Sequence, residues 1–271
     1  VCGTGGDRLN TFNISTTVAL IASAAGITVA KHGNRAITSQ AGSADVLEAL
    51  GVRIDLSPEQ AAAFLRDHQF AFLFAPRYHP AFKNIADARK LCAERGERTI
   101  FNFLGPVLNP ARPTAQLVGV PNPKLCEPLA HVLQALCVRR AMVVSGAAGS
   151  GQLDEFSTLG QTVVAEFYQY HAFTNSTFSG DEFPLQKVVL SDLRGGDAAT
   201  NAKIIRDILQ GNDRGPKRDA VLLNSAAALF VADRAKTMIE GWDVAAEVID
   251  SGRALARLDE LVRASALVTS R

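Results

Sequence analysis

The sequence predicts an α/β fold: a large domain with a mostly parallel sheet flanked by helices. Short apolar segments alternate along the chain with helical patterns, and several of these segments end in glycine-rich or charged turns. With 271 residues, 47% of them hydrophobic, the chain can bury a substantial core. Ligands of such folds gather at the carboxyl ends of the strands, so the turns after predicted strands are the first candidates for a functional site.

The first third of the chain alternates between strands and helices. Val1 and Cys2 have the character of a strand end, and the glycine-rich turn behind them opens a helix. Ser57 and Pro58 are typical of the cap and the first position of a later helix. We expect strands at residues 27–30 and 70–75, and helices at residues 15–25 (closed by Gly26), at 42–50 (ending at Gly51) and from residue 58 onward.

The rest of the chain contains a polar helical region, a turn-rich region and a second α/β part. Residues 78–98 are helical in character, and residues 102–113 carry several glycine, asparagine and proline turn signals. We expect core strands at 116–120 and 141–145 around a helix at 127–136, an edge strand at 162–168, and helices at 198–210, 219–232 and 243–263, separated by 211–216 and by Gly241.

Charge and composition exclude several classes of protein. The 28 basic and 27 acidic residues give a net charge of +1, which offers no field to attract nucleic acid or an anionic membrane. The four cysteines show no metal-ligand spacing, and no uninterrupted apolar stretch reaches the roughly 18 residues of a membrane span. Cytoplasmic location is the default expectation, and any polyanionic ligand has to be held by local chemistry.

The first chemical pattern is the turn Gly3-Thr4-Gly5-Gly6-Asp7, followed by the polar stretch from Asn10 to Thr17. Glycines free backbone amides to surround an anion, and hydroxyl groups and a helix N-terminus add donors. The plainer interpretation is a tight turn with a helix cap. The density of asparagine and hydroxyl residues behind the turn favours a phosphate site.

The second pattern, from Lys31 to Arg35, follows a predicted buried strand and continues through Ser39 to Ser43. It offers two cations, a histidine and an asparagine, which suit a phosphate or pyrophosphate. The plainer interpretation is a solvated loop.

The third pattern is the adjacent pair Asp154 and Glu155 behind a glycine-rich segment. Such a pair is usually just solvated, but beside a phosphate site it suits Mg²⁺, which takes substrate phosphates as further ligands.

Together these segments resemble a known enzyme family. GTGGD with NTFNIST, KHGNRAITS, RTIFNFLGPVLNPARP and LDEFS are similar, in order and spacing, to the successive motifs of anthranilate phosphoribosyltransferases. RGGD at 194–197 and RDAVLLNSAAAL at 218–229 extend the resemblance toward the C-terminus. The resemblance implies transfer of the phosphoribosyl group from phosphoribosyl pyrophosphate (PRPP) to the amine of anthranilate, in tryptophan biosynthesis.

The resemblance also implies which residues bind. Those that match PRPP-binding positions are Gly3, Gly6, Asp7, Thr11, Asn13, Ile14, Ser15, Thr16, Lys31, Asn34, Ser39 and Ser43. Those that match anthranilate-binding positions are Gly3, His32, Asn34 and Arg89. Two magnesium ions in each site would be held by Ser15, Asp154 and Glu155. The expected catalytic residues are Lys31, Asp154 and Glu155.

The resemblance further implies the domain organisation. Residues 1–75 and 113–271 would form the PRPP-binding α/β domain, and 76–112 would be a helical segment of a small domain that covers the acceptor. The N-terminal part of that small domain is expected to be missing here, and the family implies a homodimer. Arg89 and Thr99 lie ten residues apart, which is more than is usual in the family, so we expect a small insertion within 90–96.

Two other functions remain open at this point. A pyrimidine nucleoside phosphorylase would share the fold but use a different glycine–serine phosphate loop. A non-catalytic relative could bind nucleic acid, although the near-neutral charge and the intact acid pair argue against it.

Overall fold

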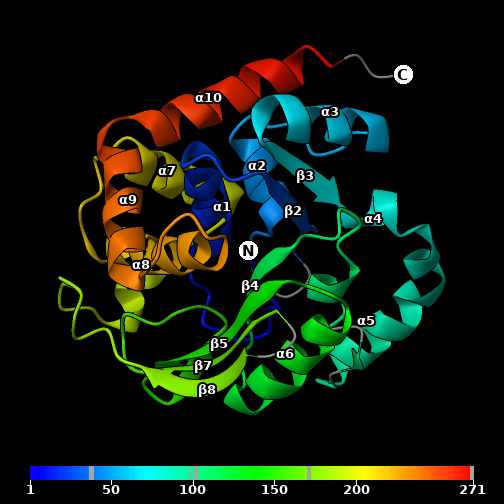
Figure 1. Ribbon diagram of the computed structural model, residues 1–271. Helices are drawn as coiled ribbons and strands as arrows, with labels where there is room; N and C mark the ends of the chain where they lie inside the picture. The colour runs from blue at the N-terminus through cyan, green and yellow to red at the C-terminus, as the bar shows by residue number, and fades with distance from the viewer. Residues whose placement is uncertain (37–39, 98, 101–102, 170–171, 269–271) are drawn as a thin grey trace.

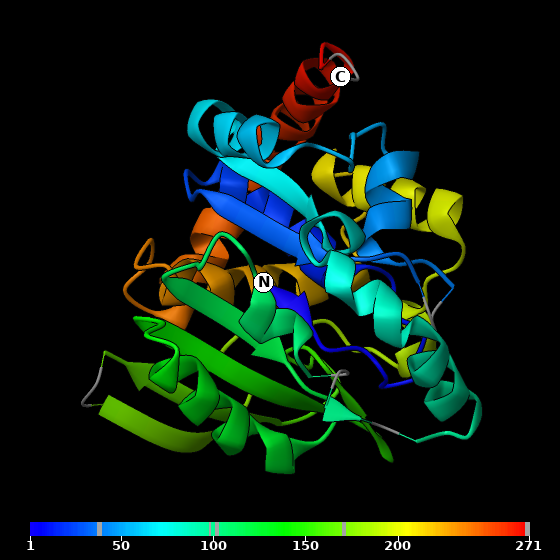
Figure 2. The same ribbon diagram turned by 90° about the vertical axis from the view of Figure 1, so that its right-hand side faces the viewer.

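Two groups of strands form the centre of the computed structural model, which describes residues 1–36, 40–97, 99–100, 103–169 and 172–268. The larger sheet has the order β1-β4-β5-β7-β8, with β6 also paired to β5. Its strands are β1 (Cys2–Gly3), β4 (Ala115–Gly119), β5 (Arg140–Ala148), β6 (Gly151–Leu153), β7 (Thr162–Tyr168) and β8 (Ala172–Phe178). A two-stranded sheet of β2 (Val29–Gly33) and β3 (Phe70–Phe74) lies beside β1 (Figure 2).

The strand directions change along the chain. The pairs β1–β4, β4–β5 and β2–β3 are parallel, whereas β5–β6, β5–β7 and β7–β8 are antiparallel. The α/β class is confirmed, but the expectation of a mostly parallel sheet fits only the first half of the strands. The described residues between β5 and β8 contain no helix, and without a crossover helix consecutive strands can only turn back on one another.

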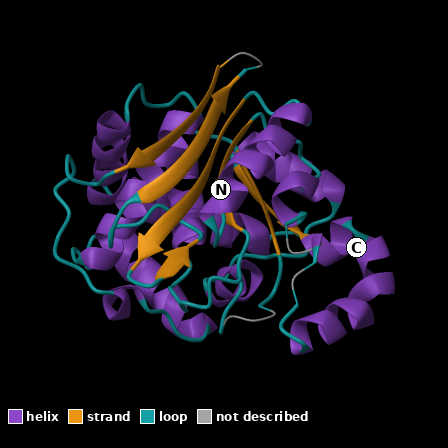
Figure 3. Ribbon diagram, turned by 90° about the horizontal axis from the view of Figure 1, so that it is seen from below, coloured by secondary structure: helices purple, strands orange, loops and turns teal. Residues whose placement is uncertain are grey.

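Helices cover both faces of the sheet (Figures 1 and 3). Helices α1 (Ile14–Ala24) and α8 (Pro216–Val231) pack on one face, and α6 (Cys126–Ala135) packs on the other. The sheet residues alternate accordingly: Leu117 joins the larger core with α1 and α8, while its neighbour Val118 joins the smaller core under α6. This alternation is the period of two that a strand imposes on its side chains.

Most expected helices are present. Further helices are α2 (Ser43–Ala49), α3 (Pro58–His68), α7 (Ala198–Leu209), α9 (Met238–Asp250) and α10 (Arg253–Ala266). Ser57 caps α3 as predicted, its hydroxyl accepting from the N–H of Gln60 at 3.2 Å. The single helix expected at 243–263 is wrong, because Gly252, with φ of +78°, separates α9 from α10.

Two other expectations are also wrong. Gly241 does not separate helices but lies inside α9, where a Cβ atom would stand 2.7 Å from the carbonyl oxygen of Ala226 on α8. Residues 162–168 do not form an edge strand, since β8 pairs with β7 on its outer side. The sequence of β8, AFTNSTF, is polar and mostly exposed, so it carries no strong strand pattern.

A short helical region lies to one side of the sheets. It consists of α4 (Ala75–Tyr78), η1 (Pro80–Ile85) and α5 (Ala86–Glu94), and it follows directly from the end of β3 (Figure 1). The division of the chain at residues 76 and 112 stays a prediction. Among the described helices, none combines the length and the apolar character that crossing a membrane requires.

Candidate active site

The glycine-rich turn after β1 is shaped by the acid segment that crosses it. Gly5 and Gly6 have φ of +76° and +83°, which favours glycine at both positions. The N–H of Gly5 donates to Asp154 Oδ2 at 2.7 Å. A Cβ atom on Gly3 would lie 2.2 Å from the same oxygen, and one on Gly119 would lie 1.5 Å from the carbonyl oxygen of Asp154. Asp154 therefore lies directly across the carboxyl ends of β1 and β4.

The loop from this turn to α1 holds four of the twelve predicted PRPP-binding residues: Gly6, Asp7, Thr11 and Asn13. The side-chain amide of Asn13 is fixed on both sides. Its oxygen accepts from Asn201 Nδ2 on α7 at 2.8 Å, and its nitrogen donates to the carbonyl of Ala41 at 3.2 Å. Gly195 of the RGGD segment packs against this loop, since a Cβ there would lie 2.7 Å from the Cα of Phe12.

The first turn of α1 carries Ile14, Ser15 and Thr16. Ile14 does not offer a group to a ligand, because its side chain is 2% exposed in the core and its N–H donates to the carbonyl of Phe12. Its buried side chain anchors the first turn of α1 in the core. The hydroxyl of Thr16 is buried and has no hydrogen-bond partner among the described residues. The helix N-terminus adds partial positive charge that favours an anion here.

Lys31 lies on β2 and is only 3% exposed. Its ammonium group donates to the carbonyl of Val1 at 3.2 Å and to the hydroxyl of Ser15 at 3.4 Å. Burial lowers the pKa of Lys31, while Cys2 and Glu155 nearby raise it. The structure thus brings Lys31 and Ser15 together beside Val1, at the start of β1.

Asp154 and Glu155 are not a solvated pair. They follow β6 and are 9% and 8% exposed, and no basic side chain lies within ion-pair distance of either in the described part of the chain. Burial, together with the neighbouring charge of Asp7, raises the pKa of Asp154 to about 7. Burial and the charge of Asp154 raise the pKa of Glu155 well above its ordinary value. Two buried carboxyl groups without a cation are well suited to take one up.

The described residues hold no group of three or more acidic, histidine or cysteine side chains that could bind a metal alone. A cation between Asp154 and Glu155 would need further oxygen ligands, such as the Ser15 hydroxyl, water and substrate phosphates. Mg²⁺ prefers this kind of mixed, oxygen-only shell. The residues present therefore fit magnesium.

Helix α8 holds the acid pair in place. Asn224 is fully buried, and its side chain accepts from the N–H of Phe156 at 2.9 Å and donates to the carbonyl of Phe156 at 3.0 Å. These two hydrogen bonds to the backbone fix Phe156, the residue next to Glu155. The sequence signal for it is the polar pair Asn224 and Ser225 in the otherwise apolar stretch 220–231, which is part of the family resemblance.

The expected acceptor side contains a histidine that sequence analysis had not assigned to the site. His32 Nδ1 lies 3.2 Å from the carbonyl of Gly105, and its ring meets that of His79 edge-on, with centroids 5.0 Å apart. Burial lowers the pKa of His32, so the ring is neutral with Nδ1–H donating. The Nε2 atoms of both histidines are buried and have no partner among the described residues. The signal for His79 was the His-Pro step at the start of the helical region.

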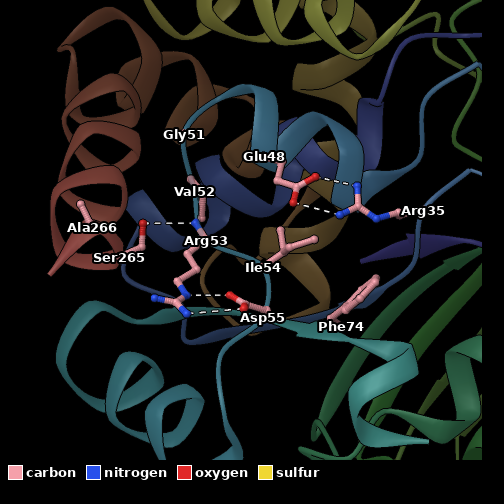
Figure 4. A pocket seen from close by; sticks show the side chains of 10 residues that line it. All are labelled: Arg35, Glu48, Gly51, Val52, Arg53, Ile54, Asp55, Phe74, Ser265 and Ala266. Atoms are coloured by element: carbon pink, nitrogen blue, oxygen red, sulfur yellow. Dashed lines mark hydrogen bonds and ion pairs between the residues drawn. The ribbon is translucent and has the colours of Figure 1, made fainter. Parts of the chain in front are cut away.

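Not all predicted residues are placed at the site. Ser39 lies outside the described residues. Arg89 lies in α5, but its side chain is not described. Arg35, expected as a second cation for a phosphate, instead pairs with Asp45 and Glu48 on α2. Figure 4 shows it on the wall of a separate cavity of about 550 Å³ that contains none of the acid pair.

Comparison with known proteins shows the family of this chain. Residues 1–255 match the family described as "Glycosyl transferase family, a/b domain". The anthranilate phosphoribosyltransferase of Chloroflexus aggregans is 47% identical over 264 residues, which is 97% of this chain and 76% of that protein. The chain thus belongs to the anthranilate phosphoribosyltransferase family, and the resemblance stated from the motifs is confirmed.

Solved structures are similar over nearly the whole chain. The anthranilate phosphoribosyltransferase of Thermus thermophilus has a TM-score of 0.87 and 40% identity, covering 96% of this chain and 75% of that one. The enzyme from Saccharomyces cerevisiae, in complex with PRPP and Mg, has a TM-score of 0.86 and 30% identity, covering 98% of this chain and 73% of that one.

Proposed function

We propose that this protein transfers the phosphoribosyl group of PRPP to the amine of anthranilate and releases pyrophosphate, as a step of tryptophan biosynthesis. The observation that carries the proposal is the buried pair Asp154 and Glu155, which lies across the glycine turn with no basic partner among the described residues. Neither nucleic acid nor a membrane has a role in this function, and we expect a cytoplasmic homodimer.

The donor site is formed by the glycine turn, the first turn of α1 and Lys31. Donors for the phosphate groups come from the amide of Asn13 and the hydroxyls of Ser15 and Thr16 at the start of α1. The N–H groups of Thr4 and Gly5 already bind the carbonyl of Gly119 and the carboxylate of Asp154, so they shape the turn instead. Asn34 and Ser43 complete this side from the second loop, and we assign Ser39 to it by the family pattern. Lys31, held beside Ser15, neutralises part of the pyrophosphate charge.

Asp154 and Glu155, with Ser15, hold a pair of Mg²⁺ ions in this proposal. When bound, magnesium neutralises the pyrophosphate and so makes it a better leaving group. The residues themselves keep the metal and the leaving group fixed. Because Asn224 anchors the neighbouring backbone, this arrangement exists before substrate binds and needs little reorganisation.

The acceptor lies on the side of His32, His79 and Asn34. The two rings and their unpartnered Nε2 atoms offer an aromatic surface with polar edges, which suits an aromatic amine. Arg89 is assigned to the carboxylate of anthranilate, with which a guanidinium forms paired hydrogen bonds.

The reaction needs little acid–base help. The bond between ribose C1 and the pyrophosphate oxygen breaks, its electron pair leaves with pyrophosphate, and the amine nitrogen forms the new bond to C1 and then loses a proton. An aniline-type nitrogen is neutral near pH 7, so the protein mainly orients it and stabilises the departing charge. In this proposal Lys31 and the first turn of α1 stabilise the departing pyrophosphate.

The direct test supplies the purified full-length protein with PRPP, Mg²⁺ and anthranilate and follows the loss of anthranilate fluorescence. We expect turnover that stops when a chelator removes Mg²⁺. Turnover only with another aromatic amine would change the acceptor and keep the transferase. Phosphate-dependent cleavage of thymidine or uridine, or a salt-sensitive gel shift without turnover, would instead contradict the proposal.

A further inference from the structure

We propose that Asp45 is a positioning residue for PRPP: it closes the base of the loop between Asn34 and Ser43 and thereby sets these two residues at the donor site. This inference rests on the proposed function. It concerns the two ends of the second loop of the site, residues 34–36 and 40–43.

Asp45 binds both ends of this loop. Its Oδ2 accepts from the N–H of Ala36 and from the N–H of Gly42, both at 2.9 Å. Its Oδ1 accepts from the guanidinium of Arg35 at 3.0 Å. One carboxylate therefore joins the residue that enters the loop to the residue that leaves it. Bonds of this kind, between a charged acceptor and backbone N–H groups, are stronger than neutral ones.

The backbone at the base of the loop is closely packed. A Cβ atom on Gly42 would lie 2.4 Å from the nitrogen of Ala36 and 2.7 Å from the carbonyl oxygen of Asn34. That carbonyl accepts from the N–H of Ala44 at 3.2 Å and from the hydroxyl of Ser43 at 3.5 Å. Asn34 and Ser43 are thus held against each other, so a change at the base of the loop moves both.

Capping α2 does not by itself explain these contacts. An acid at the third position of a helix often reaches back to the N–H of the cap residue, which here is Gly42. The additional bonds to Ala36 and Arg35 involve the other end of the loop and contribute nothing to the helix start. We therefore assign them to loop closure.

Arg35 supports the same role. Its guanidinium also pairs with Glu48 one turn further along α2, at 2.6 and 2.9 Å (Figure 4). Because two carboxylates already neutralise Arg35, it is not a cation for pyrophosphate. Its side chain instead fixes the entry of the loop to the helix that carries Asp45.

The test is steady-state kinetics of Asp45→Asn in the full-length protein. An asparagine has one acceptor oxygen, so it cannot serve the two backbone N–H groups and the guanidinium together. We expect the KM for PRPP to rise about tenfold or more, from the loss of charged hydrogen bonds, with kcat within about threefold. The KM for anthranilate should rise clearly less, because Asn34 is assigned to both substrates but Ser43 to PRPP alone. Glu48→Gln is the matched control, because it weakens only the Arg35 pair, and we expect its KM for PRPP to change less than about twofold.

Gly42→Ala is a second variant. Its new Cβ would push the two ends of the loop apart while Asp45 stays intact, so the KM for PRPP should again rise more than the KM for anthranilate. Melting temperatures of all variants are measured alongside. An unchanged KM for PRPP in both Asp45→Asn and Gly42→Ala, or an equal rise of both substrates' KM values, overturns the inference. Absence of turnover in the wild-type protein in the same assay would instead refute the proposed function.

Discussion

At the scale of single residues, the chemistry depends on burial of groups that are normally solvated. Lys31, Asp154 and Glu155 are all at least nine-tenths buried, and they come from two elements far apart in sequence. Removing water strengthens each electrostatic interaction with a bound pyrophosphate and metal. It also makes the empty acid pair unfavourable in its ionised form, which raises the pKa of both carboxyl groups.

Substitution of either acid should reduce turnover strongly. For Asp154→Asn or Glu155→Gln we expect a loss of roughly 10² or more in kcat, comparable to the removal of one electrostatic stabiliser. The asparagine at 154 can still accept from the N–H of Gly5, so the turn should keep its shape. The exposed acid Asp181 is the control, and Asp181→Asn should leave kcat unchanged. Unaltered magnesium-dependent turnover in the double variant would refute the metal assignment.

Magnesium binding should depend on pH. The pKa of Asp154 in the folded protein is about 7, above its ordinary value of 3.8. Between pH 3.8 and about 7 the folded protein holds a proton on Asp154 that the unfolded chain does not. The free energy of unfolding therefore falls as the pH rises toward 7, and the contribution of Asp154 is constant above that. Mg²⁺ has to displace the proton. We expect its apparent affinity to fall about tenfold per pH unit below 7 for each proton released.

Thermal shift titrations with Mg²⁺ between pH 5.5 and 8.5 measure this dependence. The variant Asp154→Asn has no proton to release at this position, so its dependence on pH should be weaker. An affinity of the wild-type protein that is the same across this range would contradict the role of the buried carboxyl groups.

At the scale of secondary-structure elements, the site is formed where backbones approach too closely for side chains. Gly3 and Gly119 end neighbouring parallel strands, and the segment of Asp154 crosses both. Helix α8 supports that segment through the hydrogen bonds between Asn224 and Phe156. The strand ends and the helix therefore act as one rigid support for the acid pair.

Gly119→Ala should disrupt this crossing. The new Cβ would stand 1.5 Å from the carbonyl oxygen of Asp154, which is backbone and cannot rotate away. We expect the free energy of unfolding to fall by about 3 kcal/mol or more, at the upper end for an overpacked core. Gly160→Ala is the milder comparison, since its new Cβ would lie 3.3 Å from the side chain of Ala147, which has to give by only a few tenths of an ångström. Urea denaturation of both variants provides the comparison.

Asn224→Ala should weaken both stability and metal binding. It leaves the N–H and carbonyl of Phe156 without their partner in a buried place, which costs about 1–3 kcal/mol. The freed segment should also bind Mg²⁺ more weakly. Asn175→Ala on the exposed strand β8 is the matched control. A destabilised Asn224→Ala protein with normal Mg²⁺ affinity would limit Asn224 to a structural role.

At the scale of the whole molecule, ligand binding should stabilise the fold. The site joins residues from β1, β2, α1 and the segment after β6, so a bound ligand links parts of the chain that separate on unfolding. Other long-range ties act alongside: His68 on α3 pairs with Glu260 on α10 at 2.7 Å, and Arg257 donates to the carbonyl of His68 at 2.8 Å.

PRPP with Mg²⁺ should therefore raise the melting temperature, with a gain of about 2.7 kcal/mol when the ligand is at 100 times its Kd. Addition of a chelator should remove most of this gain. In Glu155→Gln the gain should be much smaller at the same concentrations. Equal stabilisation with and without Mg²⁺ would show that PRPP binds without the metal.

The sequence by itself determined features that depend on neighbouring residues. The cap at Ser57, the glycine turn before α1 and the ends of the first two helices at Gly26 and Gly51 follow from local backbone preferences, and all agree with the structure. The order of the motifs was enough to identify the family. These signals lie within a few residues of the feature they predict, so a single sequence contains them.

The tertiary structure decided what depends on which segments meet. It buried Asp154 and Glu155, turned Arg35 toward α2, placed His79 against His32, and made β7 an inner strand. Burial and long-range pairing have no local signal, because an exposed loop and a buried one can have the same residues. Burial and pairing arise only when distant elements pack together, and they determine the charge state of the acid pair and the groups that can reach a substrate.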